Sequence, residues 1–397
     1  MKRRDFLKNT GLASSLFLVP SFVKAFEKIA TEQLGFKRLV IIQLSGGNDG
    51  LNTVIPFRND IYYKKRQDIA IPKSKIISLT DDLGFHESLL PLKQLYDQGY
   101  VSIINNVGYP NPDRSHFRST DIWHTATDAD KYATSGWLGR YLDQYGQHPF
   151  NAIEVDDSLS LALKGEINNG IATKNAALLF NSAREPYFKK ILANQQDAHL
   201  SEHNLGYLYK TLIAAESSAK YIYETSKTFK SKQEYPQSPF AKQLKTTAEF
   251  INSGLDTKVF YTSLGGFDTH ANQLNKQKQL LKVYAEGIES FVKDLKENDT
   301  FKDTLILTFS EFGRRVQQNA ANGTDHGTAN NVFIIGENLK QKGIYNGAPN
   351  LLKLDTNGDL IYEIDFRQIY ATVLENWLGV DAKAILFEKS FKKLHFI

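Results

Sequence analysis

The 397-residue sequence contains no cysteine. Disulfide bridges and thiolate ligands are therefore excluded, so any metal ion must be bound by oxygen and imidazole groups. The chain also lacks an excess of basic residues once its first 25 residues are set aside. These carry five positive charges and one negative charge, so their removal lowers the formal net charge from +4 to zero. Nucleic-acid binding is not expected, because it requires a basic field that attracts the phosphate backbone.

Only one long apolar run is present. It spans Gly11–Phe22, follows the basic residues Arg3 and Arg4, and precedes the small residue Ala25. This order is typical of a cleaved export signal, so we predict a signal peptide over residues 1–25 and no membrane span in the rest of the chain. Arg3-Arg4 followed by Phe6 resembles the twin-arginine export motif, with a general secretory signal as the alternative. We therefore expect an exported protein, periplasmic or extracellular. Twin-arginine export carries folded proteins and would suit one with a seated metal ion.

Residues 36–397 alternate between apolar strand patterns and helical patterns. A chain of this length with 41% hydrophobic residues can bury a large core. Alternation of this kind predicts an α/β fold, a three-layer α/β/α sandwich whose mainly parallel sheet is covered on both faces. The clearest strands are Arg38–Leu44, Lys258–Thr262 and Leu305–Phe309, and the clearest helices are Glu87–Gln98 and Ala271–Glu297.

The pattern changes between residues 150 and 245. Strand-like pieces at Ala152–Val155 and Ala176–Phe180 are followed by polar helical stretches at Pro186–Gln195 and Leu205–Phe229. Because the strand series resumes at Lys258, we interpret residues 150–245 as an insertion that caps the main domain rather than as an independent domain.

Acidic and imidazole side chains follow the three clearest strands. In open α/β sheets, ligands bind beyond the carboxyl ends of the strands, so these side chains are expected to meet at one edge. Carboxylate and imidazole together suit zinc, manganese or iron. The candidate metal ligands are Asp49, Asp268, His270, Glu311, Asp325 and His326.

Each candidate also has a local explanation. Asp268 would cap a helix that begins near Ala271, and Asp49 would form an ordinary Asx turn. Asp325 and His326 would belong to a hydrogen-bonded turn. These alternatives remain open from the sequence alone.

For Glu311, the local alternative is a salt bridge with Arg314 or Arg315, which would contribute little stability. One shared site nevertheless explains the four groups better than four separate coincidences, because all of them follow strands that should lie side by side.

The segment Asp355–Asp359 resembles half of a calcium-binding loop. Leu360 stands where that loop needs glycine and Phe366 where it needs a bidentate Glu. A hairpin turn at Asn357-Gly358 is therefore the favoured prediction.

Several motifs together resemble a known family. They are LSGGNDGLNTVIP, RSHFRSTDIWHT, GGFDTHANQ, LTFSEFGRR, DHGTAN and DFRQIYATVLENWLG, and they extend from about Lys37 to Gly379. The set resembles DUF1501, a family of exported bacterial proteins of unknown function. That family is placed in the alkaline phosphatase-like superfamily with sulfatases and cofactor-independent phosphoglycerate mutases.

The superfamily resemblance implies an α/β/α sandwich with two metal ions at the carboxyl ends of the strands. The implied ligands in this chain are Asp49, Asp268, His270, Glu311 and His326. The implied nucleophile begins a helix after an early strand, and Ser115 is the nearest match, with Thr120 as a second choice. Beside Ser115, Arg114 or Arg118 would hold ester oxygens and His116 would orient the substrate or serve a structural role.

Two departures from the superfamily pattern limit this comparison. Glu311-Phe312 stands where many members have Asp-His, so one imidazole ligand is absent. The chain has no Cys, and Ser115 lacks the surrounding Pro-Ser-Arg pattern, so the formylglycine signature of sulfatases is missing. Sulfatase activity of the usual kind is not expected.

Two functions follow from these observations. The first is hydrolysis or transfer at a phosphate or related ester of a small molecule or polymer, with a divalent ion such as zinc or manganese. The second is an exported binding protein that retains the fold without catalysis and recognises a glycan, a partner or a surface polymer. The 19 tyrosines are compatible with sugar stacking.

Overall fold

The structure is a computed structural model that describes residues 36–186 and 204–397. The expected signal peptide lies outside these residues, as does nearly all of the helix predicted over Pro186–Gln195. Residues Arg38–Ile397 form one compact unit. Within the described part of the chain, no helix is long and apolar enough to cross a membrane.

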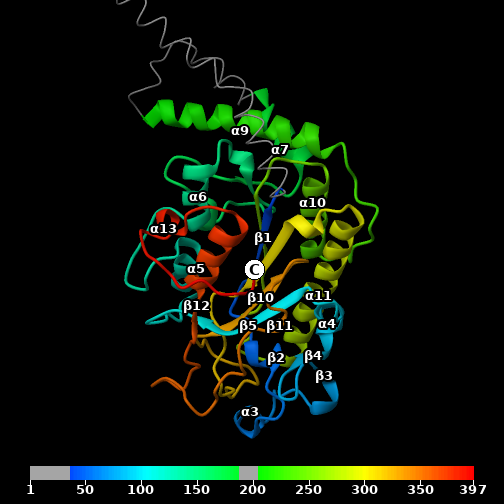
Figure 1. The fold of residues 1–397 in the computed structure, drawn as a ribbon, viewed down its shortest axis with the longest axis vertical. Coiled ribbons are helices and arrows are strands. Elements are labelled where there is room, and N and C mark those ends of the chain that lie inside the picture. Colours follow the sequence, from blue (N-terminus) through cyan, green and yellow to red (C-terminus); the bar gives the residue numbers. More distant parts are fainter. Residues whose placement is uncertain (1–35, 187–203) are drawn as a thin grey trace, which may run out of the picture. The chain divides into compact units, whose positions relative to one another are not determined.

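A nine-stranded mixed sheet forms the centre of this unit (Figure 1), and a separate three-stranded sheet has the order β2-β4-β3. The central strands run in the order β11-β5-β10-β9-β1-β8-β6-β7, and β12 pairs with β5. All pairs in the central sheet are parallel except those of β10 with β9 and β5. The predicted mainly parallel α/β sheet is therefore confirmed. The strands are β1 (Arg38–Leu44), β2 (Val54–Ile55), β3 (Ile76–Ser78), β4 (Gly84–His86), β5 (Val101–Gly108), β6 (Ala152–Glu154), β7 (Ile171–Ala172), β8 (Val259–Leu264), β9 (Thr304–Phe309), β10 (Asn330–Ile335), β11 (Gly343–Ile344) and β12 (Ile364–Asp365).

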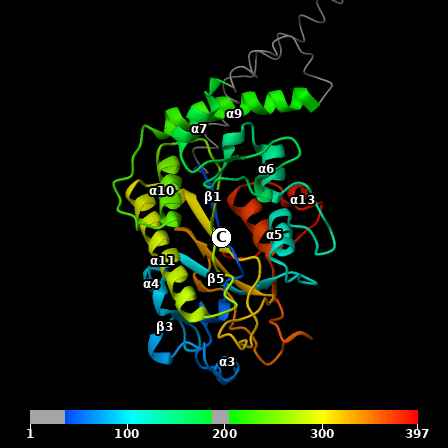
Figure 2. The ribbon, with the colours of Figure 1, turned by 180° about the vertical axis from the view of Figure 1, so that it is seen from behind.

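Helices cover both faces of the central sheet, as Figures 1 and 2 show from opposite sides. In β1, alternate side chains face opposite layers. Leu39 and Ile41 belong to the core cluster that includes residues of α5, α6, α12 and α13, and Val40 and Ile42 belong to the cluster that includes residues of α4, α10 and α11. This is why the strand reads as a continuous apolar run. The helices are α3 (Asp60–Lys65), α4 (Leu90–Asp97), α5 (His116–Thr125), α6 (Trp137–Tyr145), α7 (Ala176–Ala183), α9 (Asn204–Ser226), α10 (Pro239–Asn252), α11 (Gln273–Glu297), α12 (Phe366–Thr372) and α13 (Ala382–Ile385).

Strand direction brings distant loops to one edge of the sheet. β9, β1 and β8 are neighbours and parallel, so the loops that follow them start at the same edge. β10 is antiparallel to β9, so the loop between these two strands begins and ends there. β5 is antiparallel to β10 and therefore also ends at this edge, just before the loop that leads to α5.

The block at residues 150–245 is only partly what the sequence predicted. Its first strands, β6 and β7, extend the central sheet through β8. The strand predicted at Ala176–Phe180 is wrong, because these residues belong to helix α7. The N-cap residue of this helix, Asn175, accepts hydrogen bonds from the backbone N–H groups of Ala177 and Leu178. Helix α9 confirms the helical stretch predicted at Leu205–Phe229. A capping role for the block remains a prediction.

Candidate metal centre

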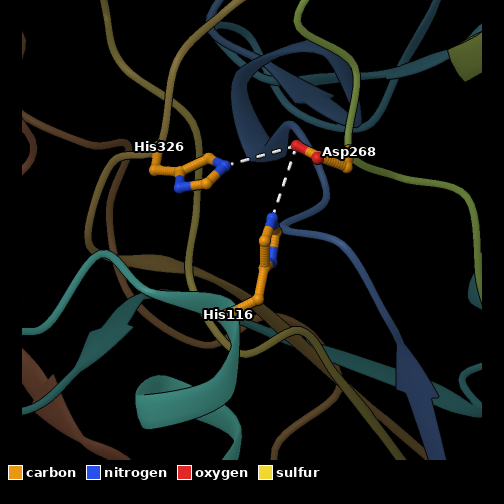
Figure 3. Close-up of side chains that lie close together, drawn as sticks. All are labelled: His116, Asp268 and His326. Carbon is orange, nitrogen blue, oxygen red and sulfur yellow. Dashed lines mark hydrogen bonds and ion pairs between the residues drawn. The ribbon is translucent and has the colours of Figure 1, made fainter.

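Three imidazole rings converge on one carboxylate oxygen at this edge of the sheet. Asp268 Oδ1 lies 3.4 Å from His116 Nε2, 3.0 Å from His270 Nε2 and 3.3 Å from His326 Nε2. Figure 3 shows the side chains of His116, Asp268 and His326 pointing toward one another. The ligand atoms of these three residues all lie within 4.8 Å of one another, so the group could hold a metal ion.

The far nitrogen of each ring is fixed by an oxygen acceptor. His116 Nδ1 lies 2.8 Å from Glu311 Oε1, and His326 Nδ1 lies 2.7 Å from the backbone oxygen of Arg114. His270 Nδ1 lies 3.2 Å from Asp325 Oδ1. Because a carbonyl or carboxylate oxygen can only accept, Nδ1 carries the proton in each ring. In the neutral rings, each Nε2 then presents a lone pair toward Asp268 Oδ1, which can also only accept, so this side of each ring needs a second proton or a metal ion.

This arrangement leaves nitrogen lone pairs facing one another. His270 Nε2 and His326 Nε2 are 2.9 Å apart. His116 Nε2 is buried and has no hydrogen-bond partner among the described residues. Two lone pairs at such a distance repel each other unless a cation lies between them, and that cation is either an additional proton or a metal ion.

Arg314 is the fixed positive charge of the site. Its guanidinium is buried, lies 2.6 Å from Asp268 Oδ1 and donates to the backbone oxygens of Gly47 and Thr324. Partial burial alone would raise the pKa of Asp268, but the hydrogen bond and charge of Arg314, together with His270, hold it well below its usual value. Asp268 is therefore a carboxylate at neutral pH.

The pKa values of His116 and His326 are shifted in opposite directions by their surroundings. The hydrogen bond and charge of Glu311 raise the pKa of His116. Burial lowers the pKa of His326. Neighbouring sites with pKa values shifted apart in this way are typical of functional centres.

Gly46 allows the loops to approach this closely. Its φ of +112° favours glycine, and a Cβ atom there would lie 2.5 Å from the backbone nitrogen of Asp268. Its own N–H donates to Glu311 Oε1 at 2.8 Å. The glycine after β1 thus brings the loop after β8 and the end of β9 into contact.

Gln273, the first residue of α11, connects the loops that follow β1, β8 and β9 through its side-chain amide. Its Oε1 accepts from Thr269 Oγ1 at 3.2 Å and from Thr324 Oγ1 at 2.6 Å, and its Nε2 donates to Asp49 Oδ2. Thr269 is next to His270, and Thr324 is next to Asp325. One buried amide therefore holds the two segments that carry His270 and His326.

Of the predicted ligands, five join one network with His116: Asp268, His270, Glu311, Asp325 and His326. Asp49 does not contact them directly among the described residues. Its Oδ1 accepts a hydrogen bond from the N–H of Leu51, which forms the Asx turn considered as the local alternative for Asp49. Its Oδ2 lies 2.6 Å from Arg66 Nη1. Gln273 connects Asp49 to the segments that carry His270 and His326.

Two other local alternatives are wrong. Helix α11 begins at Gln273 with Asn272 as its N-cap, so Asp268 does not cap it. Arg314 pairs with Asp268 and Arg315 lies near Asp359, so neither of them is the partner of Glu311.

The predicted catalytic residues lie at the start of α5. Ser115 is exposed and is the N-cap residue, but its side chain makes no capping hydrogen bond. His116 is the first helical residue. The guanidinium of Arg114 pairs with Asp355 at 2.9 Å and with Asp359 at 2.5 Å, so it is occupied by these carboxylates.

The sequence interpretation missed three features of the centre. It gave His116 a role beside the substrate rather than among the ligands, and it did not identify Gln273. It treated Phe312 only as the loss of a ligand, whereas the Phe312 ring lies 4.8 Å from both the His116 and the His326 rings. The signal for His116 was its place in the motif RSHFRSTDIWHT.

Comparison with known proteins identifies a family. A family model described as "Protein of unknown function (DUF1501)" matches residues 36–390. No curated protein matches the chain.

Similar solved structures are distant. The lipoteichoic acid synthase LtaP from Listeria monocytogenes has 9% identity over 79% of this chain and 68% of that one, with a TM-score of 0.38. The C-terminal periplasmic domain of EcEptC from Escherichia coli, in complex with Zn, has 12% identity over 76% and 72%, with a TM-score of 0.35. An alkaline phosphatase superfamily protein from Vibrio parahaemolyticus has 11% identity over 89% and 70%, with a TM-score of 0.40. At this similarity, no conclusion about activity follows.

Proposed function

The chain belongs to the DUF1501 family, and we propose that it is an exported metal-dependent hydrolase or transferase acting on phosphate or related esters. The observation that carries the proposal is the convergence of three Nε2 atoms on Asp268, with every Nδ1 held by an oxygen acceptor. The proposed ligands are His116, Asp268, His270 and His326, and the proposed ion is zinc or manganese.

The donor set fits such an ion. Three imidazole nitrogens and one carboxylate oxygen are typical ligands of zinc and are also accepted by manganese. Ligand atoms about 2.0–2.2 Å from a tetrahedral zinc ion lie roughly 3.4 Å from one another. The ligand atoms of His116, Asp268 and His326 all lie within 4.8 Å of one another, and Asp268 Oδ1 is 3.4 and 3.3 Å from the two Nε2 atoms, so these three residues fit such an ion. His270 Nε2 lies 3.0 Å from Asp268 Oδ1 and 2.9 Å from His326 Nε2 but does not belong to that group of three, so its role as a fourth ligand is a prediction. The buried Nε2 of His116, which has no hydrogen-bond partner among the residues that the structure describes, would then donate its lone pair to the ion.

A bound ion would supply a Lewis acid that draws electron density from an ester oxygen and offsets the charge that develops there. The chain's own residues would orient the ligands of the ion. Glu311 orients His116, Asp325 orients His270, and the carbonyl of Arg114 orients His326. This fixed orientation reduces the reorganisation needed when the ester reacts.

Ser115 is the proposed nucleophile. It stands at the N-terminus of α5, next in sequence to His116, and its exposed hydroxyl is not used for capping. The first N–H groups of a helix and its dipole favour an approaching anion such as a phosphate ester. Because the guanidinium of Arg114 is paired with Asp355 and Asp359, we assign the binding of the ester oxygens to this helix end rather than to Arg114.

A catalytically silent binding protein is the second candidate. The observation that favours it is the 2.6 Å contact between Arg314 and Asp268, because this pair satisfies the carboxylate without a metal ion. Metal content separates the two functions. Protein purified from its native host should contain zinc or manganese if the first is right, and should contain neither if the second is right.

Turnover tests the hydrolase directly. Purified protein loaded with zinc or manganese is assayed with aryl phosphate monoesters, aryl phosphate diesters and aryl sulfates. We expect turnover of at least one phosphate ester, its loss in Asp268→Ala/His270→Ala, and its retention in His395→Ala, which removes an exposed histidine elsewhere. Turnover that survives the double substitution would rule out this centre as the active site.

A further inference from the structure

A small apolar cavity lies beside the candidate centre. Its volume is about 120 Å³. Aromatic and aliphatic side chains form most of its wall: Tyr109, Pro112, Phe312, Leu360, Ile361 and Tyr362. The carboxylates among its lining residues are Asp113 and Asp355.

Phe312 is shared by the cavity and the centre. Its ring lines the cavity and also lies 4.8 Å from the rings of His116 and His326, tilted by 34° and 35°. The cavity also reaches the start of α5, because its lining residue Asp113 accepts a hydrogen bond from the N–H of Ser115 at 2.7 Å. The Phe312 ring would therefore lie between a group in the cavity and the rings of His116 and His326. The lining residue Asp113 precedes the proposed nucleophile Ser115 by two residues in the sequence.

The outer wall of the cavity is a hairpin fixed by ionic contacts. Leu354 and Leu360 form an antiparallel bridge, and Gly358 has a φ of +81°, which confirms the predicted turn at Asn357-Gly358. Arg114 binds the hairpin through Asp359, whose side chain is fully buried. The cavity is thus preformed, which lowers the entropy cost of binding a ligand there.

We propose that this cavity binds the uncharged alcohol part of the ester, and that the protein prefers phosphate or related esters of compact apolar alcohols. The proposal rests on the proposed function. Its size limit comes from the cavity: a space of about 150 Å³ holds one benzene ring, and this cavity is smaller, at about 120 Å³, so one aromatic ring would fill it and reach its mouth, and a short branched alkyl group would fit within it. No lysine or arginine is among the lining residues that the structure describes, so the anionic end of the ester would find no counter-charge in the cavity. That end is therefore directed toward the proposed metal site.

Ile361 is the best position for a test. Its side chain lines the cavity and is 41% exposed, so a larger side chain can cover the mouth without disturbing the core. Ile361→Trp is expected to weaken the binding of phenol, the probe for the alcohol part, at least tenfold. Ile361→Phe is expected to give a smaller loss. Leu352→Trp is the matched control, because Leu352 is 84% exposed, precedes the same hairpin and does not line the cavity.

Phenol binding is measured by NMR titration or calorimetry, and the kcat/KM for phenyl phosphate is compared with that for methyl phosphate. We expect Ile361→Trp to lower kcat/KM at least tenfold for phenyl phosphate only, and Leu352→Trp to change neither substrate. Circular dichroism melts establish that each variant is folded, and if Ile361→Trp does not fold, Ile361→Phe decides.

The outcomes separate the two proposals. If wild-type protein does not bind phenol, or if the Ile361 variants bind it as tightly as Leu352→Trp does, the cavity proposal is wrong. If phenol binding is lost only in the Ile361 variants while no ester is turned over, the cavity is a binding site for apolar rings and the hydrolase proposal is wrong.

Discussion

Asp49 and Arg66 form an ion pair of 2.6 Å in which neither side chain is exposed. Arg66 also donates to the backbone oxygens of Arg315 and Val316, so the pair ties the loop after β1 to the loop after β9. Asp49, predicted as a metal ligand, thus stabilises the contact between the loops that follow β1 and β9. Its substitution is expected to affect folding first.

Asp49→Ala should destabilise the protein by about 3–5 kcal/mol, because it leaves a buried guanidinium without its partner. Asp49→Ala/Arg66→Met should cost much less than the two single changes added together. Urea denaturation measures both. Asp97→Ala is the control: it breaks a surface pair with Lys93 and should cost less than about 1 kcal/mol. A small effect of Asp49→Ala on stability, combined with a large loss of metal affinity, would return Asp49 to the ligand set.

Glu311→Gln should lower the affinity for zinc about 10–100-fold, because Glu311 orients His116 by accepting its Nδ1–H and strengthens it as a ligand. The amide keeps the size of the side chain but not its charge. Competition with a chromogenic chelator measures the affinity. Glu337→Gln changes an exposed carboxylate and should leave the affinity at the wild-type value. Equal affinities in the two variants would show that Glu311 does not support a ligand.

Glu154 should make the protein less stable as the pH rises. It ends β6, is 5% exposed, and burial raises its pKa from 4.5 to about 7. The folded state therefore binds more protons than the unfolded state between these values, and stability falls as the pH rises through this window. Glu154→Gln should remove this loss, a gain relative to wild type of roughly 3 kcal/mol between pH 4.5 and pH 8.

Urea denaturation at pH 4.5, 6 and 8 measures this difference for Glu154→Gln. Glu297→Gln, at an exposed position on α11, should keep the pH profile of the wild type. Parallel profiles for the wild type and Glu154→Gln would disprove the shifted pKa.

The sheet could be predicted because its strands are buried on both faces. The apolar runs that form β1, β8 and β9 are typical of strands buried on both faces of a parallel sheet. Parallel pairing places the ends of these strands at one edge of the sheet, where the candidate centre lies. The antiparallel direction of β10 could not be read, because a buried strand has the same pattern in either direction. The short run Ala176–Phe180 was ambiguous for the same reason, and the capping residue Asn175 was the better signal for a helix.

The residue types of the centre could be predicted, but their partners could not. Spacing along the chain offered Arg314 or Arg315 as a local salt-bridge partner for Glu311, as the alternative to metal binding. In the folded chain, Arg314 instead reaches Asp268, and Glu311 contacts His116, which lies 195 residues away in the sequence. Such choices depend on how loops from separate strands pack, and a single sequence does not contain that information.

Metal binding to purified protein tests the central claim most directly. After removal of metal by chelation, calorimetric titration with zinc should show one ion per chain. His326→Ala should weaken its affinity at least a hundredfold, and His395→Ala should leave it unchanged. If the wild type binds no zinc, or binds it as tightly after His326→Ala as before, then the convergence of His116, Asp268, His270 and His326 is not a metal centre.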